Sequence, residues 1–325
     1  MAPLEASRVA DAALPVIDVS GLSSGWFADR QAVGEQLRAA CVDNGFFYAA
    51  NHGVPAGLID AVFAETKSFF DRSSTEKAAL DKSRSICNRG FEPLPAPTPK
   101  KGAPPDLKES FSIGPDLPLQ DPRVVARRFN QGPNLWPADL PGFRPTMKAY
   151  FAAMLDLSER LMAGLALSLG LNEDHFAAYC TEPLAILRLL HYPQPPGNAA
   201  PGENDAGAHT DFGGLAVLLQ DEAGGLQVQG KTADEWLQAA PIPATCVVNL
   251  GDMMARWTNG LYRSTRHRIV NVSGREQYAV PFFFDGNPDH MIECLPACLA
   301  PGDTPKYTPI TVEGHLREMN LWIYP

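Results

Sequence analysis

The sequence predicts an α+β fold in which a helical first half precedes a β-rich second half. In the first half, apolar residues recur every three or four positions, which is the spacing of a helix face. After residue 183 the pattern changes to short apolar runs separated by Gly, Pro, Asn and Asp. Such runs are typical of the strands of a sandwich or barrel. Because no internal repeat is visible, we expect one unit built around a β-core.

The first half is expected to alternate strands and helices before one long helix. Val33, Leu37 and Cys41 recur at helical spacing, and Gly45 supplies a stop for that helix. The expected elements are a strand at 14–19, a helix at 29–44, a strand and turn at 45–53, and helices at 56–70 and 145–170. In the second half, strands are expected at 184–192, 214–220, 225–229, 245–250, 267–272 and 278–284.

Residues 92–106 contain six prolines and two lysines and are not expected to form a regular element. An irregular segment of this length in a compact domain is often a lid or a binding loop. A surface connector is the alternative, and the sequence leaves both open.

Composition excludes several classes of protein. The net charge of −10 argues against non-specific nucleic-acid binding, which needs a basic face. No run approaches the roughly 18 apolar residues of a membrane helix, and the N-terminus lacks a basic stretch followed by an apolar core. We therefore expect no membrane partner and a cytoplasmic location. The six cysteines are too scattered for a disulfide scaffold and are expected to be reduced: Cys41, Cys87, Cys180, Cys246, Cys294 and Cys298.

The strongest chemical signal is Ala-His-Thr-Asp-Phe at 208–212. If this segment is a strand, His209 and Asp211 point to the same side, because residues two apart share a face. A distant histidine would complete the two-histidine, one-carboxylate set that holds Fe(II) and leaves three positions open. His267, at the start of a β-branched run, supplies it. From spacing alone, a His-x-Asp pair that occurs by chance stays an alternative. Structural or solvated roles are expected for the remaining histidines: His52, His175, His191, His290 and His315.

Several ordered motifs carry a family resemblance across nearly the whole chain. They are LPVIDVSGL, NGFFYAANHGVP, NRGFEPL, DLKESFSIG, LRLLHYP, GAHTDFGGLAVLLQD, GGLQVQ, VVNLGDMMARWTNGLYRSTRHRIVN and PFFFDGNPD. With these the sequence resembles the isopenicillin N synthase-like family of Fe(II)- and 2-oxoglutarate-dependent dioxygenases. The resemblance implies a double-stranded β-helix (jelly-roll) core with N-terminal helices packed against it, and it carries the iron ligands onto His209, Asp211 and His267.

The resemblance also implies a domain division and a chemistry. It implies an N-terminal non-heme dioxygenase region at 1–140, a long connecting helix at 141–182, a catalytic core at 183–290 and a C-terminal extension at 291–325. Fe(II), 2-oxoglutarate and O2 would then oxidise a small organic molecule through a ferryl intermediate, by hydroxylation or desaturation. Tyr192 matches a family tyrosine that hydrogen-bonds the far carboxylate of 2-oxoglutarate.

The sequence departs from the family at the residues that usually bind this carboxylate. Counting back from the Pro-Phe-Phe run, Gln277 and Ala279 replace the arginine and the serine of an Arg-x-Ser motif. A buried carboxylate that lacks its partner costs about 3–5 kcal/mol. Three accounts stay open. Arg275 replaces the arginine, with Arg188 and Arg256 as weaker substitutes; or the enzyme is a 2-oxoglutarate-independent oxidase of isopenicillin N synthase type; or the chain binds metal but turns over slowly.

The substrate side is indicated only by segments that line the pocket in relatives. They place Phe91, Glu109, Phe111, Phe282 and Phe284 near a small-molecule substrate, although an aromatic stripe in a core strand is more often packing. The turn from Asn249 to Asp252 is expected to be structural. Two interpretations from other classes stay open, namely a cupin-like metal-binding or zinc hydrolytic protein and an interaction module that uses the Pro-rich segment.

Overall fold

The computed structural model describes residues 9–10, 14–94, 108–194, 206–271 and 273–323. Most of the Pro-rich segment 92–106 lies outside the described residues, so its role as lid, connector or interaction module stays a prediction. In the described part of the chain, no helix combines the length and apolar character that a bilayer crossing requires. All six cysteines are free, as predicted.

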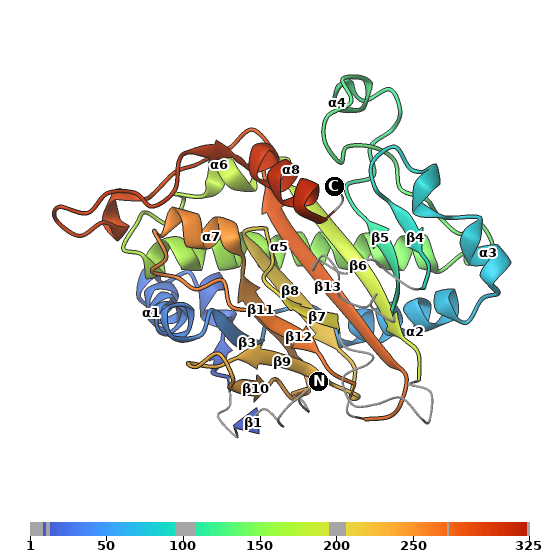
Figure 1. The fold of residues 1–325 in the computed structure, drawn as a ribbon, viewed down its shortest axis with the longest axis horizontal. Coiled ribbons are helices and arrows are strands. Elements are labelled where there is room, and N and C mark those ends of the chain that lie inside the picture. Colours follow the sequence, from blue (N-terminus) through green and yellow to red (C-terminus); the bar gives the residue numbers. More distant parts are fainter. Residues whose placement is uncertain (1–8, 11–13, 95–107, 195–205, 272, 324–325) are drawn as a thin grey trace, which may run out of the picture.

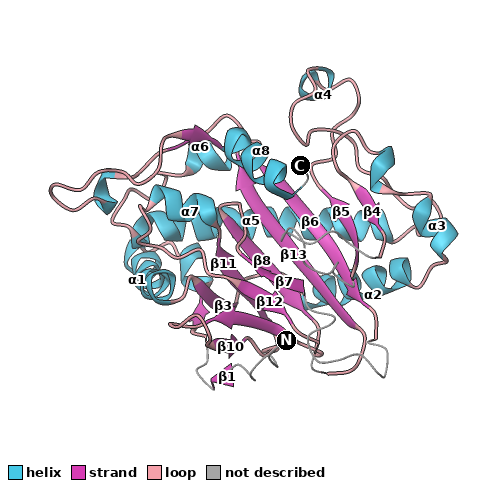
Figure 2. Ribbon diagram, viewed as in Figure 1, coloured by secondary structure: helices cyan, strands magenta, loops and turns pink. Residues whose placement is uncertain are grey.

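A large mixed sheet forms the centre of the fold (Figures 1 and 2). The first half of the chain supplies two strands at each edge, and the second half supplies the middle. All neighbours are antiparallel except the first pair. In spatial order the strands are β2 (Val16–Asp18), β3 (Phe46–Ala50), β11 (Thr245–Leu250), β8 (Leu215–Gln220), β13 (Gln277–Gly286), β6 (Leu184–Tyr192), β5 (Glu109–Ile113) and β4 (Gly90–Glu92).

A smaller sheet packs against one face of the large one. Its spatial order is β1 (Val9–Ala10), β10 (Trp236–Gln238), β9 (Leu226–Gln229), β12 (His267–Ile269) and β7 (Ala206–His209). Leu226, Val228 and Leu237 of this sheet share an apolar cluster with Phe46 and Val247 of the large sheet. Two sheets that enclose such a cluster form the jelly-roll core, which confirms the predicted fold class.

Helices cover the opposite, outer face of the large sheet, as α5 does behind β8 and β13 in Figure 1. The main ones are α1 (Phe27–Asp43), α2 (Ala56–Phe70) and α5 (Phe143–Ser168). The apolar face predicted for α5 is buried against this surface. Shorter elements are η1 (Ser20–Ser23), α3 (Ser74–Ala78), η2 (Lys82–Arg84), α4 (Pro122–Val125), α6 (Ala177–Cys180), α7 (Asp252–Trp257), β14 (Met291–Ile292), η3 (Pro296–Cys298), β15 (Ile310–Thr311) and α8 (Val312–Ile323).

Strand alternation divides the large sheet into a helix-facing side and an inward side that faces the small sheet. On β13, Phe282 and Phe284 are fully buried on the helix-facing side, where Phe282 lies 5.1 Å from Phe151 of α5 between ring centroids. Gln277 and Ala279 have the opposite parity. Ala279 shares an inner apolar cluster with Leu190, so this parity faces inward. The parity of a residue therefore decides whether it belongs to the outer core or to the interior of the jelly roll.

Candidate metal centre

His209, Asp211 and His267 meet at the edge of the small sheet, beside the jelly-roll interior. His209 ends β7 and is the register partner of His267, the first residue of β12. Oδ1 of Asp211 lies 3.9 Å from Nε2 of His209 and 3.7 Å from Nε2 of His267. Ligand atoms bound to one metal at about 2.1 Å stand about 3 Å apart in adjacent positions. Small side-chain rotations therefore bring all three onto one ion.

Backbone carbonyls fix the orientation of both imidazoles. Nδ1–H of His209 donates to the carbonyl of Gly207 at 2.8 Å, and Nδ1–H of His267 donates to the carbonyl of Thr265 at 3.2 Å. With the proton on Nδ1, each Nε2 carries the lone pair that a metal needs. Burial, followed by the nearby charge of His267, lowers the pKa of His209 to about 4, so this imidazole is neutral at pH 7.

Asp211 lies outside β7, which ends two residues earlier at His209. Its carboxylate is positioned by hydrogen bonds and not by a strand. This differs from the expectation that both ligands lie on one strand. Oδ2 of Asp211 accepts a hydrogen bond from the side-chain amide of Asn249 at 2.7 Å, and its carbonyl accepts one from the backbone N–H of Asp252 at 2.8 Å. Oδ1 is left directed at the histidines. A Cβ at Gly251 would lie 2.2 Å from the carbonyl oxygen of Gly213, so this close approach requires glycine.

Comparison with known proteins decides the family. A family model described as non-haem dioxygenase in morphine synthesis N-terminal matches residues 14–139, and one described as 2OG-Fe(II) oxygenase superfamily matches residues 183–286. The 2-oxoglutarate-Fe(II) type oxidoreductase hxnY of Emericella nidulans is 41% identical over 313 residues, covering 95% of this chain and 90% of that protein. The chain belongs to the Fe(II)- and 2-oxoglutarate-dependent dioxygenases. The resemblance seen in the sequence motifs is thereby confirmed.

Two further relatives support the same chemistry for this dioxygenase. The 2-oxoglutarate-dependent dioxygenase citB of Monascus ruber is 38% identical over 319 residues, covering 96% of this chain and 95% of that protein. The crystal structure of a full-length Neurospora crassa protein in complex with alpha-KG has a TM-score of 0.84 at 28% identity, covering 97% of this chain and 98% of that chain. Further complexes of the same Neurospora crassa protein contain thymine or 5-formyluracil. These relatives do not favour a 2-oxoglutarate-independent oxidase or a cupin-like zinc hydrolase.

The residues that replace Arg-x-Ser line the inner face of the dioxygenase. Gln277 is 1% exposed and is the register partner of Tyr192 on β6. Ala279 packs with Leu190 and Tyr192 in an inner apolar cluster. Among the described residues, Oε1 of Gln277 has no hydrogen-bond partner. An amide and a methyl group thus stand at the two positions to which the family resemblance assigns a guanidinium and a hydroxyl.

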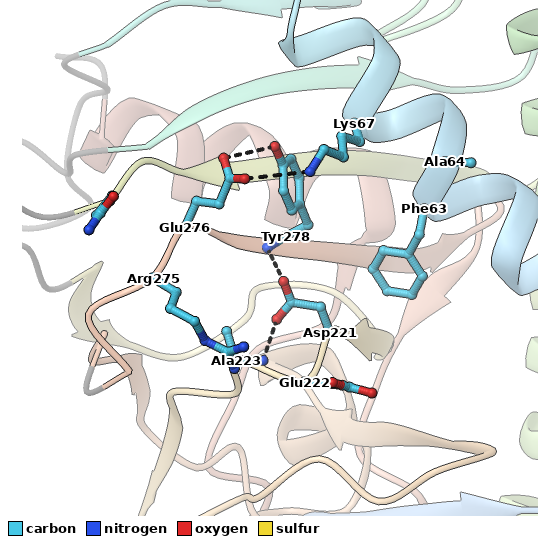
Figure 3. A pocket seen from close by; sticks show the side chains of 10 residues that line it. Phe63, Ala64, Lys67, Asp221, Glu222, Ala223, Arg275, Glu276 and Tyr278 are labelled. Carbon is cyan, nitrogen blue, oxygen red and sulfur yellow. Dashed lines mark hydrogen bonds and ion pairs between the residues drawn. The ribbon is translucent and has the colours of Figure 1, made fainter.

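Arg275 does not lie on this inner face. It precedes β13, is exposed, and lines a surface pocket together with Asp221, Glu276 and Tyr278 (Figure 3). Burial raises the pKa of the half-buried carboxyl of Asp221, and the nearby charge of Arg275 partly opposes that rise. The expectation that Arg275 reaches the co-substrate from the strand face of Gln277 is therefore not supported by its position.

The two weaker substitutes are engaged elsewhere. The guanidinium of Arg188, on β6, forms an ion pair with Glu92 and donates to the hydroxyl of Ser110 at 3.0 Å. Arg256, on α7, donates to the carbonyl of Thr308 at 2.7 Å and stacks on Tyr307 at 5.2 Å. Both arginines serve structural contacts, so neither replaces the missing guanidinium.

The predicted substrate residues lie on the opposite side of the sheet from the metal ligands. Phe91 and Phe111 pack on Phe69 of α2, with ring centroids 6.1 and 4.5 Å apart. Glu109 shares their parity and forms a buried ion pair with Lys77 at 2.7 Å. Phe282 and Phe284 belong to the same outer core. The placement of all five in the substrate pocket is therefore corrected: Phe91, Glu109, Phe111, Phe282 and Phe284 stabilise the contact between sheet and helices.

Parity explains this error and points to what the sequence interpretation missed. Neighbours of these residues, such as Ser110 and Arg188, face inward. The sequence predicts a structural role for Asn249, whereas its amide orients a metal ligand from β11. The position of Asn249 in an apolar, buried strand indicates such a role, because a buried polar side chain needs a hydrogen-bond partner. The histidines assigned structural roles do make such contacts; for example, Nδ1 of His52 accepts from the N–H of Val54 at 3.1 Å.

Proposed function

We propose that this chain oxidises a C–H bond of a small organic molecule at an Fe(II) ion held by His209, Asp211 and His267. The observation that carries the proposal is the convergence of these three side chains, whose ligand atoms all lie within 4.8 Å of one another. Two imidazole nitrogens and one carboxylate oxygen suit Fe(II) and leave three positions for a chelating co-substrate and O2. Fe(II) held by these residues would activate O2, which is the oxidant, at the expense of 2-oxoglutarate.

The residues around the three ligands would orient them toward an ion and shield one side of the site from water. Asn249 and the backbone carbonyls of Gly207 and Thr265 fix the three ligands before metal arrives. Tyr192 and Ala279, which are 4% and 2% exposed, form part of the inner wall next to Gln277. A water-poor wall strengthens electrostatic contacts and protects a reactive site from solvent. We assign the co-substrate to this wall, with Tyr192 as one hydrogen-bonding residue.

Other parts of the assignment stay predictions from the sequence. They are the division at residues 140, 182 and 290, the choice between hydroxylation and desaturation, the cytoplasmic location and the lack of nucleic-acid partners. The small-molecule character of the substrate agrees with the thymine and 5-formyluracil complexes of the Neurospora crassa protein.

Oxygen consumption tests the proposal. Protein loaded anaerobically with Fe(II) and mixed with 2-oxoglutarate is expected to consume O2 and release succinate in equal amounts, faster when a true substrate is present. Protein loaded with Zn(II) is the matched control and is expected to be inactive, because zinc has no redox chemistry. Hydrolytic activity with Zn(II), together with no O2 uptake with Fe(II), would contradict the proposal.

A further inference from the structure

The inward face of β13 provides no cation for the far carboxylate of 2-oxoglutarate. Gln277 presents a neutral amide and Ala279 a methyl group. Carboxylates in dry pockets are usually held by charge-assisted hydrogen bonds. A cation from another strand is therefore needed, and it must lie near Tyr192, the register partner of Gln277.

Lys108 continues the row of residues that contains Tyr192 and Gln277. It directly precedes β5, whose first residue, Glu109, is the register partner of His191. The next residue on β6 is Tyr192, which pairs in turn with Gln277 on β13. Neighbouring strands lie about 4.8 Å apart. Lys108 is therefore one strand from Tyr192 and two strands, or roughly 10 Å, from Gln277.

The side chain of Lys108 points into the jelly roll. Adjacent strand residues face opposite sides, and Glu109 faces the helices, where it contacts Lys77 at 2.7 Å. Electrostatics agree with this direction. The charge of Lys108 is among those that lower the pKa of Glu92, after the charges of Arg188 and Lys82 and the hydrogen bond from Ser110. It is half-buried, so its charge lies at the edge of the interior.

Arg188, another inward cation of the described residues, lies too far from this row. It precedes Tyr192 by four residues on β6, which corresponds to roughly 13 Å along a strand. Its guanidinium is also paired with Glu92. The flexible four-carbon stem of a lysine, in contrast, lets an ammonium reach over a neighbouring strand.

We propose that Lys108, together with Tyr192, binds the far carboxylate of 2-oxoglutarate in place of the missing arginine. This inference rests on the proposed function, because it concerns the co-substrate of the same site. The anchoring charge then comes from the residue that precedes β5, in the first half of the chain, and not from β13. An ammonium acts as a point charge and needs no bidentate geometry, so the neutral Gln277 is tolerated beside it.

Binding of two 2-oxo acids to Fe(II)-loaded protein without O2 tests the proposal. 2-Oxopentanoate has the same five-carbon chain as 2-oxoglutarate, with a methyl group in place of the far carboxylate. Both are titrated while the charge-transfer band of the iron chelate is recorded. The wild type is expected to bind 2-oxoglutarate at least about tenfold more tightly than 2-oxopentanoate, as a hydrogen bond to a charged group implies.

The variant Lys108→Met is expected to lose this discrimination. Its dissociation constant for 2-oxoglutarate should rise about tenfold or more, whereas that for 2-oxopentanoate should stay unchanged. Lys108→Gln is the second variant should the first fold poorly by circular dichroism. Arg275→Met, which removes an exposed cation outside the inner face, is the matched control and should bind both acids like the wild type. Adding Gln277→Arg and Ala279→Ser to Lys108→Met should restore 2-oxoglutarate binding.

The outcomes separate the two proposals. Equal binding of the two acids by the wild type, or unchanged 2-oxoglutarate binding by both Lys108 variants, would overturn the role of Lys108 and leave the proposed function intact. If the wild type binds Fe(II) but develops no charge-transfer band with either acid, the proposed function fails, and the assignment of Lys108 fails with it.

Discussion

Removal of the Asn249 amide tests how the structure orients its carboxylate ligand. Asn249 is 5% exposed on β11, and its Nδ2 donates to Oδ2 of Asp211 at 2.7 Å. This contact holds the other carboxylate oxygen toward the two histidines. In Asn249→Ala the carboxylate loses that donor and gains rotational freedom, so the metal must order it on binding.

The expected loss follows from two independent magnitudes. A hydrogen bond to a charged group contributes about 1.5–3 kcal/mol. Residues that orient metal ligands typically change metal affinity by about 10- to 100-fold, which is roughly 1.4–2.8 kcal/mol. The two ranges agree, so we expect the dissociation constant for Fe(II) to rise about 10- to 100-fold in Asn249→Ala.

An equilibrium competition with a chromogenic iron chelator, without O2, measures this affinity. Asn134→Ala is the matched control, because Asn134 is 8% exposed and its amide bonds the backbone of Gly114 away from the metal ligands. Both variants should lose stability, but only Asn249→Ala should lose Fe(II) affinity. An unchanged dissociation constant in Asn249→Ala would refute the orienting role of this amide.

Three further predictions concern the ligands, the co-substrate and pH. His209→Ala and His267→Ala should each abolish Fe(II) binding and turnover, because two protein ligands remain; wild-type-like activity in either variant would contradict the assignment. With Lys108 present, Gln277→Arg with Ala279→Ser should tighten 2-oxoglutarate binding by less than about tenfold in a charge-transfer titration, because the far carboxylate already has a cationic partner; a larger gain would argue against the role of Lys108. Burial, and after it the charge of Asp211, raises the pKa of Asp285 to about 7. The metal-free folded state therefore holds this proton more tightly than the unfolded chain, and stability falls as pH rises from about 4 to about 7. In Asp285→Asn the free energy of unfolding should no longer fall over this range, a difference on the order of 2–4 kcal/mol between pH 4 and pH 7. Denaturant titrations at several pH values measure it, and the same pH dependence in the variant as in the wild type would contradict the prediction.

The sequence was sufficient for elements whose pattern is local. The apolar face of α5 and the short runs that became β6, β8 and β11 are each visible within one segment, because periodicity reports burial directly. The ligands were also accessible, since His209 and Asp211 are close in sequence and His267 begins a β-branched run. β4 and β5 were missed because they are short strands of mixed composition beside a Pro-rich segment.

The remaining features depend on register between distant strands. Alternation shows that Phe282 and Phe284 share a side, but only the packing of α5 shows that this side is the outer core. The contact of Asn249 with Asp211 likewise joins residues 38 positions apart. The row of Lys108, Tyr192 and Gln277 spans three strands, and no single segment of the sequence reveals it.

The metal site itself is tested most directly by a crystal grown without O2 in Fe(II), with anomalous scattering measured on both sides of the iron absorption edge. We expect one iron peak within about 2.2 Å of Nε2 of His209, Nε2 of His267 and Oδ1 of Asp211, with the other coordination positions occupied by solvent or co-substrate. A peak bound by other side chains, or six protein ligands around the ion, would contradict the account.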